Sequence, residues 1–495
     1  MIHFTVGDVM DAVEPRWSAG VDRTAYVPAI CTDSRHLDKE CLFVGLEGPN
    51  FDGARFAESA IRGGAICVLA TDSPRARERL GELSAAYGVA TVTCDDARAA
   101  LAAIAREVRA RLTRATVFGI TGSCGKTSTK AILASLLAAE VPVVSSPASF
   151  NNEIGVPRTL FLADEHTGAL VVELGTNGPG EIAQLAEIAR PRIAIVTCVG
   201  HSHLEGLGSL GGVLREKGDL VAALEGVDDS LCVLNLDCPR TPHLMRRVPE
   251  GTRLVTVSAA GDERASLHTT RVERRADGTA FQLGGELATA LPGEHFVSLL
   301  GTHAVGNALL SLAPLAALGA PVGRMASRLA GLRPEPHRLA PRSAGGVLLV
   351  DDSYNANPES VAAAIEVLEG LPATVRTLVL GPMAELGHES VELHRAVAGH
   401  AAAAGIDRLV LVGEAPFEDE LAACAQAAKA RGLVVHRAGG RDEAAALLLR
   451  RAGRPARGEA ILVKASRTAA LDQLVDALEA GLDGVSADRS PEVTA

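Results

Sequence analysis

A short glycine-rich segment, residues 119–128, carries the residue types best suited to binding phosphate. Its sequence is Gly-Ile-Thr-Gly-Ser-Cys-Gly-Lys-Thr-Ser. Glycines allow backbone N–H groups to approach phosphate oxygens, Lys126 adds a full positive charge, and the Thr127 hydroxyl can hold Mg²⁺. The apolar run at 115–118 predicts a buried strand before the segment, and residues 130–137 predict a helix after it. A strand, a glycine-rich turn and a helix N-terminus together favour a nucleotide-binding loop.

The spacing of this loop is shorter than the common P-loop pattern. That pattern places a glycine five residues before Gly125, where the chain has Ile120, and the first glycine of the loop is Gly122 instead. A glycine-rich turn that binds nothing is the alternative interpretation. The residues expected around the phosphates are Gly122, Ser123, Cys124, Gly125, Lys126, Thr127 and Ser128.

Acidic and histidine side chains follow two further predicted strands, at the sheet edge where open α/β folds bind ligands. Glu173 ends the apolar run at 169–173, and its carboxylate suits Mg²⁺, which prefers oxygen ligands. The alternative is an acid that caps the next turn. His201 and His203 follow the run at 193–199. They are candidates for a metal site or a phosphate contact, whereas an isolated loop histidine is often only solvated.

Other polar positions are candidates for ligand contacts. Lys217 lies on the next predicted helix, where a surface lysine is the ordinary expectation. Asn307 lies near a predicted helix start. It can hydrogen-bond a base or a sugar, or it can be only a residue of the helix start. Residues 351–357, Asp-Asp-Ser-Tyr-Asn-Ala-Asn, follow a predicted strand, a common place for active-site loops, although these residues also favour turns and N-caps. Residues 464–467, Lys-Ala-Ser-Arg, can bind an anionic group or begin a helix.

Composition excludes several classes of protein. The formal net charge of −12, from 48 basic against 60 acidic residues, argues against a nucleic-acid-binding surface. The nine cysteines are an odd number without a C-x-x-C pair, so we expect reduced, buried thiols in a cytoplasmic protein. The N-terminus lacks a signal-peptide pattern, and no apolar run approaches the roughly 20 residues of a membrane helix. We therefore expect no membrane insertion.

Strand and helix patterns predict an α/β fold with three domains. Residues 1–112 predict a small mixed α/β domain that ends in a long Ala- and Arg-rich helix. Residues 113–330 predict a central P-loop domain with a parallel sheet, since continuous apolar strands alternate with helices. Residues 331–482 predict a Rossmann-like α/β domain, and its first part, 332–341, is a proline-rich linker. Residues 483–495 predict a disordered tail.

The expected elements of the two larger domains are short and regularly spaced. Central strands are predicted at 116–120, 169–173, 193–199 and 230–234, with helices near 125–138, 179–189, 209–224 and 302–318 and a β excursion at 262–295. C-terminal strands are predicted at 347–350, 377–380, 408–412, 433–435 and 460–463.

Taken together, these residues resemble the Mur ligase family, which builds the peptide of the bacterial cell wall. The resemblance covers the chain to about residue 480. It rests on four signatures: Phe-Asn-Asn-Glu-Ile-Gly-Val-Pro at 150–157, Glu-Leu-Gly-Thr-Asn-Gly-Pro-Gly-Glu-Ile at 173–182, His-Leu-Glu-Gly-Leu-Gly-Ser at 203–209, and the segment 351–357. The segments Asp33-Ser34-Arg35 and Phe51-Asp52-Gly53 are similar to the family's UDP-sugar-binding domain. The family's phosphate loop is shorter than the common P-loop, which explains why Ile120 stands where that pattern has a glycine.

The resemblance implies an ATP-dependent ligase that forms an amide bond through an acyl phosphate. The implied substrates are a UDP-linked muramyl tripeptide and D-alanyl-D-alanine, handled by a monomeric protein. Lys126, His203 and Lys217 would be the catalytic residues; Thr127, Glu173 and His203 would hold two magnesium ions, and Lys217 stands where family members carry a carbamylated lysine. Further ATP contacts would come from Asn307, Arg338, Asp352, Tyr354, Asn355 and Asn357. Contacts to the UDP-sugar peptide would come from Ser34, Arg35, Asn151 and Asn152.

The chain departs from the family pattern at five positions, none of them an expected magnesium or phosphate ligand. The family often has Asn where this chain has Ala304, Asp where it has Pro382 and Gly where it has Ala465. It often has Asn in place of Cys198, and a small residue or Pro in place of His201. The departures bear on fine contacts to the nucleotide and on the identity of the amine. Two alternatives stay open: a ligase of the same family with another substrate pair, as in folylpolyglutamate synthesis or secondary metabolism, and a P-loop switch that binds ATP without ligating anything.

Overall fold

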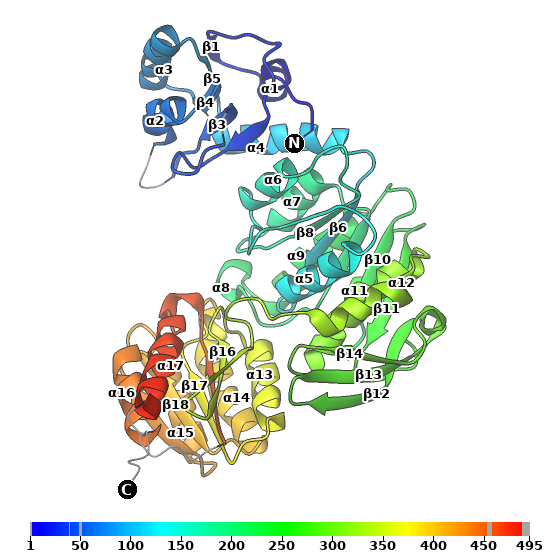
Figure 1. The fold of residues 1–495 in the computed structure, drawn as a ribbon, viewed down its shortest axis with the longest axis vertical. Helices are drawn as coiled ribbons and strands as arrows, with labels where there is room; N and C mark the ends of the chain where they lie inside the picture. Colours follow the sequence, from blue (N-terminus) through cyan, green and yellow to red (C-terminus); the bar gives the residue numbers. More distant parts are fainter. Residues whose placement is uncertain (1, 39, 49–51, 453–457, 488–495) are drawn as a thin grey trace, which may run out of the picture.

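The strands form three separate sheets, one after another along the chain (Figure 1). This computed structural model describes residues 2–38, 40–48, 52–452 and 458–487. Helices cover each sheet, which confirms the predicted α/β fold with three domains. The domain boundaries near residues 112 and 330 stay predictions. Among the described residues, none of the helices combines the length and the apolar character that a membrane crossing requires.

The N-terminal sheet is mixed, with the strand order β1-β5-β4-β3-β2 and an antiparallel β1–β5 pair. Its strands are β1 (Trp17–Ala19), β2 (Ala29–Cys31), β3 (Cys41–Gly45), β4 (Cys67–Thr71) and β5 (Ala90–Cys94), and its helices are α1 (Val6–Val13), α2 (Ala57–Arg62), α3 (Pro74–Tyr87) and α4 (Ala97–Arg111), with a 3₁₀ turn η1 at Gly53–Phe56. Helix α4 begins after Asp96, which accepts hydrogen bonds from the N–H groups of Arg98 and Ala99. Phe51 of the predicted UDP-sugar motif lies outside the described residues.

The central sheet has the strand order β14-β13-β12-β11-β10-β9-β6-β8-β7. Its strands are β6 (Thr116–Thr121), β7 (Val143–Ser145), β8 (Ala169–Glu173), β9 (Ile193–Val196), β10 (Leu231–Asn235), β11 (Arg253–Ser258), β12 (Leu267–Arg275), β13 (Gly278–Gly284) and β14 (Glu294–Val297). Its helices are α5 (Lys126–Leu137), α6 (Gly155–Phe161), α7 (Glu181–Ala189), α8 (Leu204–Leu207), α9 (Leu210–Ala222), α10 (Thr241–Met245), α11 (Thr302–Ala317) and α12 (Val322–Met325), with 3₁₀ turns η2 (Glu286–Ala290) and η3 (Ala326–Gly331). The antiparallel β12–β13–β14 meander confirms the predicted β excursion.

Alternate residues of the central strands enter two different apolar clusters. Phe118 and Ile120 of β6 pack with α5 and α11, whereas Val117 of the same strand packs in the cluster that contains α7 and α9. Because a strand directs successive side chains to opposite faces, helices must cover both faces of this sheet. Strand β6 pairs with β8 on one side and β9 on the other, so the strand order reverses here. Such a reversal places a ligand site at the carboxyl ends of the strands.

The C-terminal sheet has the order β15-β16-β20-β17-β18-β19. Its strands are β15 (Ala340–Ala344), β16 (Val347–Asp352), β17 (Val375–Leu380), β18 (Arg408–Val412), β19 (Val434–Ala438) and β20 (Glu459–Lys464). Its helices are α13 (Pro358–Gly370), α14 (Ser390–Ala403), α15 (Glu418–Lys429), α16 (Arg441–Ala452) and α17 (Asp472–Ala487), with 3₁₀ turns η4 (Gly387–Glu389) and η5 (Arg467–Ala469).

Two sequence predictions at the margins of this domain were wrong in part. The predicted linker at 332–341 overlaps β15, an edge strand that pairs with β16 through Ala340 and Pro341; an edge position tolerates the missing N–H of proline. The predicted disordered tail from Asp483 begins inside helix α17, which continues to Ala487. Asp483 accepts a hydrogen bond from the N–H of Gly345, which ties this turn to the sheet. Residues 488–495 lie outside the described part.

Candidate active site

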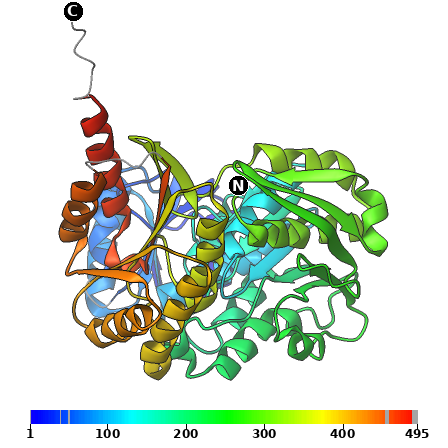
Figure 2. The same cartoon turned by 90° about the horizontal axis from the view of Figure 1, so that it is seen from below.

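A large cavity lies between the central and C-terminal domains, which Figure 2 shows side by side. Its volume is about 1380 Å³, above the roughly 300–1,000 Å³ of most small-molecule pockets. The phosphate loop, the ends of β8 and β9, the start of α11 and residues 352–357 all contribute to its lining. The cavity can therefore hold more than one small substrate at once.

Two glycines give the phosphate loop its shape. Gly122 and Gly125 have φ angles of 150° and 82°, in the region that favours glycine. A Cβ atom at Gly122 would lie 1.9 Å from Thr197 Oγ1, and one at Gly125 would lie 2.7 Å from Asn307 Oδ1. Neither position has room for a side chain, so this short loop requires both glycines. Helix α5 then begins at Lys126 beside the cavity.

Lys126 folds back over the loop. Its Nζ donates a hydrogen bond to the carbonyl of Gly122 at 2.7 Å. Burial lowers the pKa of this amine, and the negative charge of Glu173 acts in the opposite direction. Since the side chain lines the cavity, the ammonium can exchange the carbonyl for a phosphate oxygen.

The buried Glu173 carboxylate is only partly satisfied by its neighbours. Oε1 accepts a hydrogen bond from Asn151 Nδ2 at 2.9 Å. Oε2 lies 3.5 Å from Lys130 Nζ and has no hydrogen bond within the described structure. Lys130 is also buried and donates to the carbonyl of Ala148. A buried carboxylate oxygen without a donor is costly, and a cation at Oε2 would remove that cost.

His203 lies between two domains. It precedes α8 with a left-handed backbone, φ 53°, and its Nδ1 is 2.6 Å from Oε2 of Glu385 in the C-terminal domain. Nδ1 makes no aligned hydrogen bond among the described residues, and the contact is an ion pair only when the imidazole is protonated. The imidazole lowers the pKa of Glu385. The alternative of a fully solvated loop histidine does not hold, because the side chain is 18% exposed.

Lys217 is fully buried on α9 and is therefore not a surface lysine. Its Nζ has no hydrogen-bond partner among the described residues. Burial, followed by the positive charge of Lys126, lowers its pKa to about 7. An uncharged amine is the form that reacts with CO₂, so this lysine fits a carbamate.

The C-terminal domain brings a polar segment to the cavity. Asp352 Oδ2 accepts a hydrogen bond from Lys464 Nζ at 2.6 Å, and the same Nζ donates to the carbonyl of Asn355 at 2.9 Å. Lys464 is the buried last residue of β20, so it shapes this segment and does not begin a helix.

Arg338 and Tyr354 form a stacked pair beside that segment. The guanidinium carbon of Arg338 lies 4.2 Å from the centre of the Tyr354 ring, a cation–π distance. The Tyr354 hydroxyl donates to Ser149 Oγ of the central domain at 2.6 Å. The pair therefore bridges the two domains at the wall of the cavity.

Two asparagines contact the phosphate loop and its helix. Asn357 Nδ2 donates to the carbonyl of Ser123 at 3.2 Å, and its Oδ1 accepts from the N–H of Ser360, which caps α13. Asn307 Oδ1 accepts from Thr129 Oγ1 at 3.3 Å. The N-cap chemistry expected of the 351–357 segment is present, and it coexists with a position at the cavity.

Most predicted site residues line this one cavity: Ser123, Cys124, Gly125, Lys126, Thr127, Ser128, Asn151, Asn152, Glu173, His203, Asn307, Arg338, Asp352, Tyr354, Asn355 and Asn357. Gly122 and Lys217 do not line it, because Gly122 packs against Thr197 and Lys217 is fully buried. Ser34 and Arg35 lie after β2 in the N-terminal domain, where Arg35 pairs with Asp33 at 2.7 Å.

The sequence analysis missed residues that contact the predicted site residues, among them Lys130, Glu359 and Glu385. Lys130 had a usable signal, because it lies four residues after Lys126 on the predicted helix and hence on the same face. Glu359 and Glu385 had none, since their partners His201 and His203 are far away in the sequence.

No group of three or more His, Cys, Asp or Glu side chains that could hold a metal occurs in the part of the chain that is described. The predicted ligands are instead a hydroxyl, a carboxylate, an imidazole and a lysine. Mg²⁺ usually keeps several waters and takes phosphate oxygens beside one or two carboxylates. Glu173 Oε2, which accepts no hydrogen bond from the described residues and lies 3.5 Å from Lys130 Nζ, is compatible with such a sparse site.

Models of Mur ligase domains match three successive parts of the chain: the Mur ligase family catalytic domain at 27–109, the Mur ligase middle domain at 120–315, and the Mur ligase glutamate ligase domain at 337–467. The UDP-N-acetylmuramoyl-tripeptide–D-alanyl-D-alanine ligase of Escherichia coli (strain K12) is 34% identical over 490 residues, which cover 97% of this chain and 99% of that protein. This chain belongs to the Mur ligase family.

The Mur ligase fold extends over more than nine-tenths of the chain. MurF ligase from Thermotoga maritima, solved in complex with ADP, is 26% identical to this Mur ligase, with a TM-score of 0.77 over 92% of this chain and 98% of that one. MurF from Acinetobacter baumannii has a TM-score of 0.82 at 24% identity, over 97% of this chain and 99% of that one. These likenesses confirm the expected family and its three-domain fold.

Proposed function

We propose that this Mur ligase is an ATP-dependent amide ligase that adds D-alanyl-D-alanine to UDP-N-acetylmuramoyl-tripeptide in peptidoglycan precursor synthesis. The composition of the cavity supports the proposal most strongly. A phosphate loop, a buried carboxylate whose Oε2 accepts no hydrogen bond from the described residues, and a polar segment of a second domain all line one space of about 1380 Å³. The relative from Escherichia coli, which matches almost the full chain, carries the name of this activity.

The chemistry begins with a poor acyl donor. A carboxylate cannot be displaced by an amine, because the leaving group would be oxide. In the proposed reaction a terminal carboxylate oxygen of the tripeptide attacks the γ-phosphorus of ATP, and ADP leaves. The amine of D-alanyl-D-alanine then attacks the acyl phosphate, phosphate leaves and the amine loses a proton. The covalent intermediate divides one difficult step into two easier ones.

Lys126 would hold the transferring phosphoryl group. Its ammonium already lies against the loop carbonyl of Gly122 and can turn to a phosphate oxygen. The loop N–H groups and the N-terminus of α5 add partial positive charge at the same place. Fixed positive groups of this kind stabilise the charge that spreads over the phosphoryl oxygens in the transition state.

We further propose that Thr127, Glu173, His203 and carbamylated Lys217 hold two magnesium ions. When bound, Mg²⁺ supplies positive charge that neutralises the phosphate oxygens. Two observations on this chain support the assignment: Glu173 Oε2 and Lys217 Nζ are both buried without a hydrogen-bond partner in the described structure. A carbamate on Lys217 would place an anion near Lys126, whose positive charge, after burial, lowers the pKa of Lys217.

The remaining residues would position the substrates. Asn307, Arg338, Asp352, Tyr354, Asn355 and Asn357 complete the nucleotide site in this proposal, and Asn151 and Asn152 contact the tripeptide. Ser34 and Arg35 contact the uridine nucleotide from the N-terminal domain. Residues 1–112, 113–330 and 331–482 would then bind the UDP-sugar, ATP and the amine respectively, in a monomer that acts in the cytoplasm.

The product of the reaction tests the proposal. Purified protein with ATP, Mg²⁺, UDP-muramyl-tripeptide and D-alanyl-D-alanine should give a product that has gained the mass of the dipeptide less water. A tripeptide labelled with ¹⁸O in its terminal carboxylate should transfer one ¹⁸O to the released phosphate, as an acyl phosphate requires. Ligation with released phosphate that carries no ¹⁸O would refute the intermediate, and no ligation at all would favour another amine or a nucleotide switch.

A further inference from the structure

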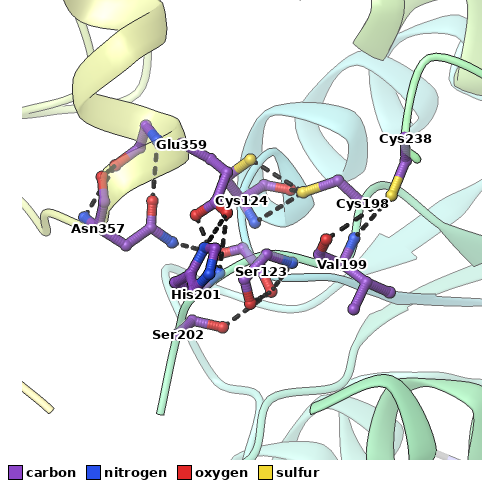
Figure 3. A network of polar contacts seen from close by, with 11 residues as sticks. Ser123, Cys124, Cys198, Val199, His201, Ser202, Cys238, Asn357 and Glu359 are labelled. Carbon is purple, nitrogen blue, oxygen red and sulfur yellow. Dashed lines mark hydrogen bonds and ion pairs between the residues drawn. The ribbon is translucent and has the colours of Figure 1, made fainter. Parts of the chain in front are cut away.

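Two cysteines approach each other at the phosphate loop (Figure 3). The Sγ atoms of Cys124 and Cys198 are 3.0 Å apart, and both residues line the cavity. Cys124 belongs to the loop itself, and Cys198 follows strand β9. The expectation that the thiols are buried was wrong for this pair, because the folded chain brings the two cysteines together at the cavity and leaves both partly exposed.

Hydrogen bonds hold the two segments together around the sulfur atoms. The N–H of Cys124 donates to Cys198 Sγ at 3.3 Å, and the Cys198 thiol lies 3.6 Å from the carbonyl oxygen of Cys124. The N–H of Ser123 donates to the carbonyl of Cys198 at 2.9 Å, and the Thr197 hydroxyl donates to the carbonyl of Cys124. The pair is therefore a built feature of the loop and not a chance contact of two mobile side chains.

The two thiols differ in acidity. The contact with Cys124 lowers the pKa of Cys198 to about 7, and the same contact raises the pKa of Cys124. The positive charge of Lys126 also favours the Cys198 thiolate, whereas Glu359 opposes it. Because the thiolate is the nucleophile in thiol oxidation, Cys198 is the sulfur that reacts first and Cys124 is the partner that resolves the product.

We propose that Cys124 and Cys198 are a redox modification site, which a peroxide converts to a disulfide that closes the nucleotide site. The Cys198 thiolate attacks one oxygen of hydrogen peroxide, so that an S–O bond forms, the O–O bond breaks and hydroxide leaves. The Cys124 sulfur then attacks the sulfenic sulfur, an S–S bond forms, the S–O bond breaks, and water leaves with the proton of Cys124. The proton that Cys198 lost at first neutralises the hydroxide. Two thiols and one peroxide thus give one disulfide and two waters.

The step needs little motion but changes the loop. A disulfide brings two sulfur atoms to about 2.0 Å, so the sulfurs must approach by about 1 Å. The loop has little freedom to follow, because Gly125 already packs closely against Asn307. A displacement of about 1 Å in groups that position a reacting phosphate can cost about 10²-fold in rate. Formation of the bond is independent of the proposed function, whereas the effect on turnover rests on it.

Other cysteines provide internal controls. Cys31 and Cys41 interact on neighbouring strands of the N-terminal domain but are buried and do not line the cavity. Cys238 accepts a hydrogen bond from the N–H of Val199 at 3.3 Å and is also buried. We expect these thiols to react more slowly, because a peroxide reaches them only through the packed interior.

The test treats the full chain with hydrogen peroxide, blocks the remaining thiols with iodoacetamide and maps disulfide-linked peptides by mass spectrometry. The expected result is a Cys124–Cys198 linked peptide that forms first, disappears with dithiothreitol, and parallels a reversible loss of about 10²-fold in turnover. A disulfide between Cys31 and Cys41 without one between Cys124 and Cys198 would overturn the proposal. Both disulfides are measured in the unmutated protein, so this outcome does not depend on a variant that folds.

Two variants separate the pair from other thiols. Each is compared with its own reduced form, so that a change in basal activity does not matter. Cys198→Ser should lose the peroxide sensitivity, whereas Cys424→Ser, a change on helix α15, should keep it. Sensitivity that persists in Cys198→Ser would contradict the proposal. If the linked peptide forms but the reduced protein never ligates, the proposed function fails and the disulfide stands.

Discussion

Glu359 of the C-terminal domain accepts hydrogen bonds from the backbone N–H of His201, 158 residues earlier in the chain, at 2.9 and 3.0 Å. The same carboxylate lies 2.7 Å from His201 Nδ1. Glu359 stands in the first turn of α13, two residues after Asn357, whose Nδ2 donates to the carbonyl of Ser123. The C-terminal domain therefore contacts the phosphate loop and the segment after β9 at adjacent positions, as Figure 3 shows.

This contact predicts the effect of Glu359→Ala. Loss of the carboxylate leaves the His201 N–H without its acceptor and loosens the docking of the C-terminal domain on the central domain. Small-angle scattering should show a larger radius of gyration for the variant, and the KM for ATP should rise. Glu369→Ala, at an exposed site on the same helix, is the matched control. Equal radii for both variants would show that the contact does not hold the domains.

The position of Lys126 predicts a large effect of Lys126→Ala on turnover. Loss of the ammonium that folds over the phosphate loop should lower kcat by at least about 10²-fold, the range found when a single group that stabilises transition-state charge is removed. Lys429→Ala, on the exposed face of α15, should retain normal turnover. Near-normal ligation by Lys126→Ala would mean that the loop does not hold the phosphates.

The Glu173 oxygen that accepts no hydrogen bond from the described residues predicts a change in magnesium dependence. Glu173→Gln keeps the shape of the side chain but replaces a carboxylate with a neutral amide, which is a poorer magnesium ligand. The Mg²⁺ concentration for half-maximal turnover should rise at least about 10-fold, an effect that even groups behind the direct ligands can produce. Glu225→Gln, at an exposed position, is the control. An unchanged magnesium dependence would remove Glu173 from the proposed ligands.

Lys217 predicts a pH dependence of stability. Its pKa is lowered from 10.5 to about 7 in the folded protein, so between these values the unfolded chain binds the extra proton. The contribution of Lys217 to the free energy of unfolding is therefore largest above pH 10.5, and it is lost as the pH falls towards 7. From pH 7 upward the free energy of unfolding should rise relative to Lys217→Met, with a slope that approaches about 1.4 kcal/mol per pH unit. Urea unfolding of both proteins measures the difference, and parallel curves would contradict the lowered pKa.

The same lysine predicts a dependence on CO₂. A carbamate forms only from the uncharged amine, which a pKa of about 7 makes available near neutral pH. Added ¹³C-bicarbonate should give a carbamate carbon signal in the NMR spectrum of the protein, and Lys217→Arg should lack it. A signal that persists in Lys217→Arg would place the carbamate elsewhere.

The sequence predicted best the strands that a continuous run of apolar residues marks. Strands β8 and β18 have the bounds that their apolar runs predicted, because both are buried and continuous. The run at 193–199 predicted too long a strand, since β9 ends at Val196. After Val196 the chain leaves the sheet. The N–H of Thr197 donates to the carbonyl of Thr121 at the end of β6, and the N–H of Val199 donates to Cys238 Sγ.

Contacts between distant segments could not be predicted. Cys124 and Cys198 meet because β9 pairs directly with β6, and the strand order of the sheet decides that pairing. The burial of Lys217 was missed for a related reason: α9 packs against both α7 and β9, so a face that a lone helix would expose is covered. The motif residues of the cavity could be predicted because their residue types and spacing are typical of ligand binding. The contacts of Glu359 and Glu385 could not be predicted, because they form only when the C-terminal domain docks on the central domain.

Phosphate release from ATP tests the central claim most directly. The purified protein is given ATP and Mg²⁺ with UDP-muramyl-tripeptide alone, with D-alanyl-D-alanine alone, and with both. The account predicts sustained release only with both, at one phosphate for each dipeptide joined. Equal release with neither substrate, or none with both, would contradict the assignment of this cavity to amide ligation.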